Sequence, residues 1–154
     1  MSENKNEFKG DVELVTKGGE FDIVIEEGLV KNCQNFDTAV LLSLFGGNCG
    51  DVNGKEKETW WGNLIPETKE EERIQSEFGC MSKALPITSG NLQKACEAAK
   101  RDVAWIKDEA GADKIEAQLS ATNAQRVQLE IDIQKDAETI AGGIYETQWQ
   151  EAVR

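Results

Sequence analysis

Two periodicities of apolar residues divide the chain into expected strands and helices. Residues 11–15 and 19–28 alternate apolar and polar positions, which predicts two short strands. The Gly18-Gly19 pair between them favours a tight turn, so a β-hairpin is expected. Residues 36–47 follow as a short apolar segment that predicts a helix ending at Gly46.

The clearest helical pattern covers residues 89–110. Ser89 is the expected N-cap, and Gly111 is the expected C-terminal stop. The apolar positions between them recur at steps of three and four and form one stripe: Leu92, Ala95, Ala99, Val103, Ile106 and Ala110. Before this helix, residues 72–85 predict one or two helical turns that end before Pro86.

Two strictly alternating segments follow the long helix. The first has one apolar face made of Ile115, Ala117, Leu119 and Ala121. The second has an apolar face made of Val127, Leu129, Ile131 and Ile133, opposite a polar face made of Gln128, Glu130, Asp132 and Gln134. The short link "TNAQ" predicts an antiparallel hairpin, with one face covered by the long helix and the other in water.

The order of these elements predicts an α+β fold: a small mixed or antiparallel sheet with helices packed on one face and a C-terminal β-hairpin. A chain of 154 residues suits one hydrophobic core. We expect a flexible N-terminal tail over residues 1–10, a single domain over residues 11–136 and a C-terminal extension over residues 137–154. Gly142-Gly143 in the extension suggests a hinge and ordering only on assembly.

The negative charge of the chain argues against polyanionic partners. Its formal net charge is -12, and no cluster of Lys and Arg offsets it. Nucleic acids and anionic membranes are polyanions, so neither is an expected partner. The longest apolar run, residues 39–45, is far shorter than the roughly 20 residues of a membrane span. No secretory signal is visible, and the four cysteines lack a CxxC pair, so reduced cytosolic thiols are expected.

The candidate chemistry is sparse, because the chain contains no histidine. Its absence removes Ser-His and Cys-His nucleophile pairs and the His-containing metal triads. The loop with Asp51, Asn53, Glu56 and Glu58 offers oxygen donors, but Gly62 stands where a calcium loop needs its twelfth-position Glu. We therefore predict a solvated turn there, and no catalytic residue, cofactor or metal site. A carboxylate-dependent peptidoglycan hydrolase stays open as an alternative function.

Three aromatic positions and one glycine stand out as a structural motif. Trp60, Trp61 and Gly62 are consecutive, and Trp105 lies in the long helix. Adjacent indoles can stack bases or sugars, but the net charge argues against nucleic acid. We predict that one indole packs under the helices and that the other is partly exposed.

The last predicted hairpin is the candidate partner-binding site. If residues 126–135 lie at a sheet edge, their unpaired backbone groups can accept a strand from another chain. The expected binding residues are Ile115, Ala117, Leu119, Arg126, Gln128, Glu130, Asp132 and Gln134. An ordinary amphipathic strand without a partner stays open as the alternative.

The order of several segments resembles the Mu-like tail baseplate family, which belongs with the sheath-initiator wedge proteins of contractile-tailed phages. The segments are "FDTAVLLSLFGGN", an acidic loop, "WWGN", "IQSEFGCM", the long helix with Trp105, and "RVQLEIDIQK", across roughly residues 20–135. The chain departs from the family at Asn63, where an acidic residue is usual. It departs again at Gln75-Ser76 and Phe78, which stand where a Gly-Ser pair and a tryptophan are usual.

The resemblance implies a non-enzymatic structural role. Such a protein would connect the wedge and hub of a baseplate to the contractile sheath and nucleate sheath assembly by strand addition. Its implied partners are the tail sheath protein and the baseplate wedge and hub proteins, with several copies, expected to be six, in a ring-shaped assembly. Its implied location is the virion tail baseplate, after synthesis in the bacterial host cytoplasm. An adaptor of a phage-like injection machine remains an alternative.

Overall fold

The computed structural model describes residues 11–17, 20–33, 35–47 and 61–149. The strands are β1 (Asp11–Val12), β2 (Leu14–Lys17), β3 (Glu20–Ile23), β4 (Ile25–Glu26), β5 (Leu29–Val30), β6 (Asn32–Cys33), β7 (Lys114–Asn123), β8 (Arg126–Lys135) and β9 (Glu138–Gln148). The helices are α1 (Asp37–Phe45), the 3-10 turns η1 (Trp61–Leu64) and η2 (Glu70–Glu72), α2 (Glu77–Ala84), α3 (Ser89–Val103) and α4 (Trp105–Ala110).

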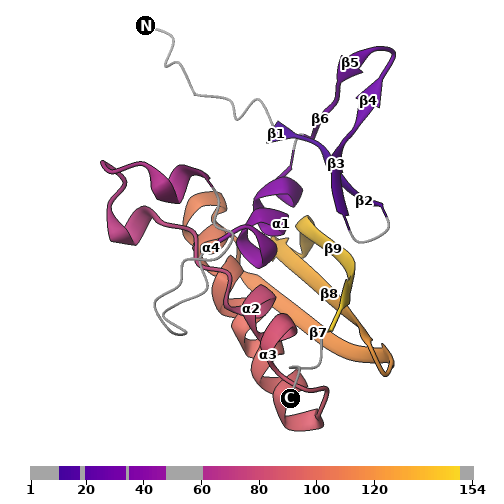
Figure 1. Ribbon diagram of the computed structural model, residues 1–154. Coiled ribbons are helices and arrows are strands. Elements are labelled where there is room, and N and C mark those ends of the chain that lie inside the picture. The colour runs from indigo at the N-terminus through magenta and orange to yellow at the C-terminus, as the bar shows by residue number, and fades with distance from the viewer. Residues whose placement is uncertain (1–10, 18–19, 34, 48–60, 150–154) are drawn as a thin grey trace, which may run out of the picture.

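The fold is built on a three-stranded antiparallel meander with the strand order β7-β8-β9. Helices α1, α2 and α3 lie on one face of this sheet, and the opposite face is open (Figure 1). Helix α3 packs over β7, while α1 reaches β9. The predicted α+β class, with helices on one face of a small antiparallel sheet, is confirmed.

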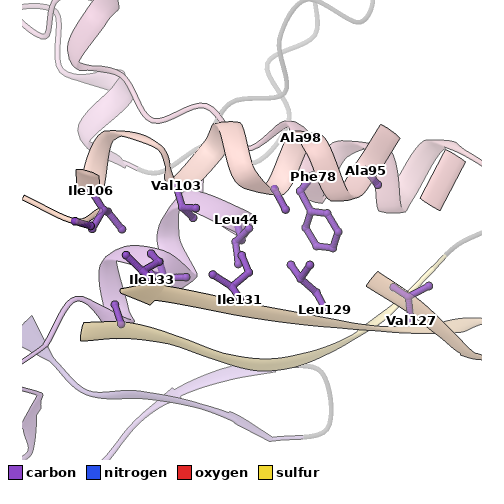
Figure 2. Close-up of a cluster of buried hydrophobic side chains, with 14 of the residues drawn as sticks. Leu44, Phe78, Ala95, Ala98, Val103, Ile106, Val127, Leu129, Ile131 and Ile133 are labelled. Carbon is purple, nitrogen blue, oxygen red and sulfur yellow. The ribbon is translucent and has the colours of Figure 1, made fainter. Parts of the chain in front are cut away.

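The hydrophobic core lies between the sheet and the helices. Alternate residues of β8 turn toward the helices and are fully or almost fully buried: Val127, Leu129, Ile131 and Ile133. Figure 2 shows these side chains facing Leu44 of α1, Phe78 of α2 and Val103 of α3. Burial of each large apolar side chain contributes about 1.5–3 kcal/mol. The alternating apolar residues of β8 and the apolar stripe of α3 therefore pack together in one core, as expected.

Residues 11–17 and 20–33 form a separate N-terminal arm, which projects away from the helices (Figure 1). Strands β2 and β3 pair as the predicted hairpin, β4 pairs with β5, and β1 pairs with β6. Three backbone bonds join the pairs: Glu13 N–H to Lys31 O at 2.8 Å, Val24 N–H to Glu13 O at 3.0 Å, and Lys31 N–H to Val24 O at 2.9 Å. The arm shares no strand ladder with the β7-β8-β9 sheet.

The long helix is interrupted where one continuous helix was expected. Helix α3 ends at Val103, and α4 starts at Trp105, because the amide of Ala104 bonds the carbonyl of Arg101 in a tighter turn. Thr88, and not Ser89, is the N-cap, since its hydroxyl accepts the Asn91 amide.

Other expected helix boundaries are confirmed. Gly111 ends α4 in the left-handed conformation, with φ 66°. Gly46 follows the last residue of α1, as predicted. Helix α2 ends two residues before Pro86, where the sequence predicted a stop.

The prediction of a separate C-terminal extension is wrong for the described residues. Residues 138–148 form β9, which pairs with β8 along its length, and Trp149 is buried. The Gly142-Gly143 pair is no hinge: Gly142 has φ 127°, and a Cβ there would lie 2.1 Å from the Ile131 carbonyl oxygen. Glycine lets β9 approach β8 closely beside a β-bulge. The predicted tail over residues 1–10 lies outside the described residues.

The cysteines only partly follow the prediction of reduced thiols. Cys33 and Cys96 are free. Cys80 is disulfide-bonded, so a reduced state is wrong at this position. Cys49 lies outside the described residues.

Candidate functional site

The predicted partner-binding edge is wrong in one respect, because β8 is the central strand of the sheet. Its backbone groups are shared between β7 on one side and β9 on the other. The segment 137–149, which the sequence suggested was an extension, supplies the second neighbour. Residues 126–135 therefore have no unpaired edge to offer, and the available edge strand beside them is β7.

The hydrogen-bond register identifies which residues of β7 face outward. The amide of Trp149 bonds the carbonyl of Gln125, so odd-numbered residues of β8 bond β9 and even-numbered ones bond β7. In β7 the partners of these even-numbered residues are themselves even-numbered. The amide and carbonyl groups of the odd-numbered residues consequently point away from the sheet: Ile115, Ala117, Leu119 and Ala121. The contact of Cys96 Sγ with Ala117 O, 3.4 Å long, agrees with this direction.

The β7 edge keeps most of its polar backbone groups unpaired. Within the described part of the chain, the Cys96 side chain bonds two outward groups, the Ala117 carbonyl and the Leu119 amide, and no hydrogen bond joins the outward amides of Ile115, Ala117 or Ala121 to another residue. Lys114 and Glu116 form an ion pair at 2.7 Å on the open face. Charged side chains on an edge strand discourage unselective pairing, so this edge is partly protected but not covered.

The β9 edge is less accessible. Asp37 at the start of α1 accepts the outward amide of Gly142 through Oδ1 at 3.0 Å. A register shift between Ile133 and Gln134 of β8 marks a bulge in the pairing with β9. Bulges and covering helices both hinder the addition of another strand. Strand β7 also has a register shift, between Ala121 and Asn123, so the Asp37 contact at Gly142 is what makes β7 the better site for strand addition.

The polar residues predicted for partner binding lie on the open face of the sheet. Gln128, Glu130, Asp132 and Gln134 alternate with the buried residues of β8. Thr139 donates its hydroxyl to Asp132 Oδ1 at 2.7 Å, and the Gln134 amide donates to Oδ2. These two bonds, the Thr139 bond foremost, lower the pKa of Asp132. The structure thus brings these side chains together as a polar surface beside the β7 edge.

The tryptophan motif is only partly within the described residues. Trp60 lies outside them, and so does the side chain of Trp61, which begins η1. Gly62 is buried, and its carbonyl accepts the Thr68 hydroxyl at 3.0 Å. The next residue, Asn63, pairs with both backbone groups of Ile74, at 2.9 Å each. The motif segment is thereby fixed to the strand-like residues before α2.

Trp105 is partly exposed, at 43%. Its indole N–H donates to the Ser43 hydroxyl at 2.9 Å and so ties α4 to α1. The residue thus links two helices and also lines a groove. Sequence reasoning had assigned it to the structural motif without this contact.

Asp102 is a capping residue that sequence reasoning missed. Its carboxylate accepts the amides of Glu77 at 3.1 Å and Phe78 at 2.9 Å, and so caps α2 from α3. The residue that precedes α2, Ser76, does not cap it, because its hydroxyl donates to the Ser43 carbonyl and accepts the Gly47 amide, each at 2.7 Å. Burial raises the pKa of Asp102 to about 7, against the opposing effect of the two amides. An acidic residue on the buried side of a helix next to an apolar stripe was the available signal.

A groove lies between α2, α3 and α4, with a volume of about 1170 Å³. We call it the α2–α4 groove. Its apolar lining comes from Ile74, Met81, Ala84, Leu85 and Trp105. Arg73 lies at its side, and Arg73 Nε is buried without a hydrogen-bond partner in the described ranges.

The described residues provide no metal centre. No group of three or more Cys, Asp or Glu side chains among them is placed to hold an ion. The loop of Asp51, Asn53, Glu56 and Glu58 lies outside them. No helix in the described part of the chain is long and apolar enough to cross a membrane.

Comparisons with known proteins give no assignment: no protein-family model, no curated protein and no solved structure matches the chain.

Proposed function

We propose that the protein is a non-enzymatic structural component of a contractile tail baseplate, which connects the wedge and hub to the sheath and nucleates sheath assembly by strand addition. The observation that carries this proposal is the β7 edge, a ten-residue strand whose outward backbone groups are bonded, among the described residues, only at Ala117 and Leu119, by Cys96. A sheath strand would add beside β7 and extend the meander to four strands.

The chemistry of β7 suits such an addition. Main-chain hydrogen bonds supply affinity in strand addition, and each is worth about 0.5–1.5 kcal/mol net. Side chains on the two faces supply selectivity: Ile115 and Leu119 border the core, whereas Glu116 and Gln118 face water. An incoming strand with the same alternation would continue both faces.

The sequence resemblance supplies the identity of the partners. The segments that resemble the Mu-like tail baseplate family include α1, the tryptophan motif, the long helix and β8. The tail sheath protein is therefore the proposed strand donor, and the wedge and hub proteins are the proposed neighbours within the baseplate.

The test uses a proline at an outward-facing amide. Ala121→Pro removes one outward donor from an exposed position and leaves the bonds from β7 to β8 intact, because proline is tolerated where the N–H faces solvent. The matched control is Ala121→Val, which keeps the amide. Binding of purified tail sheath protein to each variant is measured by surface plasmon resonance, and sheath growth is followed by electron microscopy.

We expect Ala121→Pro to bind sheath protein at least about tenfold more weakly than Ala121→Val, which corresponds to about 1.4 kcal/mol. Equal binding by the two variants would disprove strand addition at β7. Absence of sheath binding by the unmodified protein would disprove the baseplate role itself. A proline at Glu130 would not test the same idea, because Glu130 lies in the central strand β8. Loss of its amide would disrupt the sheet itself.

A further inference from the structure

Cys96 lies where helix α3 meets the outer edge of β7. Helix α3 packs over β7 (Figure 1), and the half-buried Cys96 side chain extends from the helix to that edge. Its Sγ lies 3.4 Å from the Ala117 carbonyl oxygen and also bonds the Leu119 amide. Both groups belong to the outward set that an added strand would use. One side chain therefore occupies the middle of the β7 edge.

The Cys96 thiol acts as a donor and an acceptor at once. Its S–H donates to the Ala117 carbonyl, and its sulfur accepts the Leu119 amide. Burial raises the pKa of the thiol, and the charge of Lys100 offsets only part of this effect, so the sulfur keeps its proton at neutral pH. In a parallel sheet, one residue of the neighbouring strand makes the same two bonds, to a carbonyl and to the amide two residues further on. The thiol thus takes the place of one residue of an added strand.

The thiol and an added strand compete for the same groups. An amide has one hydrogen to donate, so the Leu119 N–H bonds either the sulfur or a carbonyl of the arriving strand. Neighbouring strands lie about 4.8 Å apart, and a sulfur 3.4 Å from the Ala117 oxygen stands inside that space. The Cys96 side chain must therefore turn away before pairing can extend across Ala117 and Leu119.

We propose that the Cys96 thiol is an autoinhibitory contact on the β7 edge, which occupies the Ala117 carbonyl and the Leu119 amide in the free protein and is displaced when a partner strand adds. A thiol is a weak donor and a weak acceptor, so a strand whose side chains match the edge displaces it. A poorly matched strand gains too little to do so, and the edge is protected from unselective pairing. The partner strand is the proposed sheath strand, so the inference rests on the proposed function.

The test compares two alanine variants of α3. Cys96→Ala removes both bonds of the sulfur to β7. Gln93→Ala is the matched control, since Gln93 is an exposed residue of the same helix and also becomes alanine. Circular dichroism and thermal unfolding establish that both variants are folded. Amide hydrogen exchange, followed by NMR, measures the contact in the free protein, and surface plasmon resonance measures the binding of purified tail sheath protein.

The two measurements report on different steps. In the free protein, the Leu119 amide should exchange at least about threefold more slowly in Gln93→Ala than in Cys96→Ala, because only the control keeps the bond to sulfur. The outward amides of Ile115 and Ala121 should exchange alike in the two variants. Sheath protein should bind Cys96→Ala at least about threefold more tightly than Gln93→Ala, because the strand no longer has to displace the thiol.

The outcomes distinguish this contact from the baseplate role. Equal exchange of the Leu119 amide in the two variants would overturn the contact, whether or not sheath protein binds. Equal or weaker sheath binding by Cys96→Ala would overturn the displacement. Absence of sheath binding by every protein would disprove the baseplate role and with it the displacement by a sheath strand, while slower Leu119 exchange in the control would still support the thiol contact.

Discussion

Replacing Asp102 by asparagine should remove most of the pH dependence of folding stability near neutral pH. The pKa of Asp102 is about 7 in the folded protein, whereas in the unfolded chain the carboxyl has its ordinary pKa of 3.8. A raised carboxyl pKa means that the folded state binds more protons in this window. Stability is therefore highest below the unfolded pKa and falls as the pH rises toward 7.

The magnitude follows from the two pKa values. A difference of about three units corresponds to about 4 kcal/mol over the full range, at about 1.36 kcal/mol per unit. Between pH 5.5 and pH 8.5, about 2 kcal/mol of this loss should be observed. The lower pH of this range stays above the isoelectric point of about 4.5, where the solubility of the protein is poorest. Asp102 is 9% exposed, so solvent screens little of the effect.

The assay is urea unfolding followed by tryptophan fluorescence at several pH values. The chain has no histidine, so the side chain that usually titrates in this window makes no contribution. Between pH 5.5 and pH 8.5, the free energy of unfolding should fall by about 2 kcal/mol less in Asp102→Asn than in the unmodified protein. Parallel pH profiles for the two proteins would refute the reasoning, because they would mean that the amides of Glu77 and Phe78 keep Asp102 ionised throughout.

Three further substitutions test other contacts by urea unfolding. Asn63→Leu should cost about 2–4 kcal/mol, because it leaves both backbone groups of Ile74 unpaired; no loss would contradict this. Trp149→Ala should cost about 3–5 kcal/mol, since its buried indole also donates to the Leu85 carbonyl, whereas a surface-like cost below about 0.5 kcal/mol would oppose burial. Gly142→Ala should lower the free energy of unfolding by more than about 1 kcal/mol, because the new Cβ would collide with the Ile131 carbonyl of β8 and because the φ angle is positive. An unchanged urea midpoint would disprove this strain.

The sequence predicted the elements whose periodicity is regular. Strands β7 and β8 alternate strictly, and the stripe of α3 repeats without interruption, so class and packing face followed from local pattern. Strand β9 escaped prediction because Gly142-Gly143 and a bulge break its alternation. The position of β8 within the sheet could not be predicted for a related reason. Whether β8 is an edge strand depends on its pairing with β9, and no local sequence pattern encodes that pairing.

The candidate surfaces were predictable to a smaller extent. The alternation correctly separated the polar face of β8 from its buried face, but the open edge proved to belong to β7. The exposure of Ile25 and Leu29 contradicts what an apolar alternating segment normally indicates, since such residues usually face a core. The capping role of Asp102 depends on the tertiary contact of α3 with α2, which sequence spacing does not reveal.

The place of β9 also has a consequence for truncation of the chain. Strand β8 has two sides to satisfy, and residues 138–148 satisfy the second one. A variant cut after residue 137 would leave one side of β8 unpaired and the site of Trp149 empty beside Leu85. Exposed edges and incomplete cores bind other chains unselectively. Such a variant should therefore aggregate, although it keeps every helix of the core.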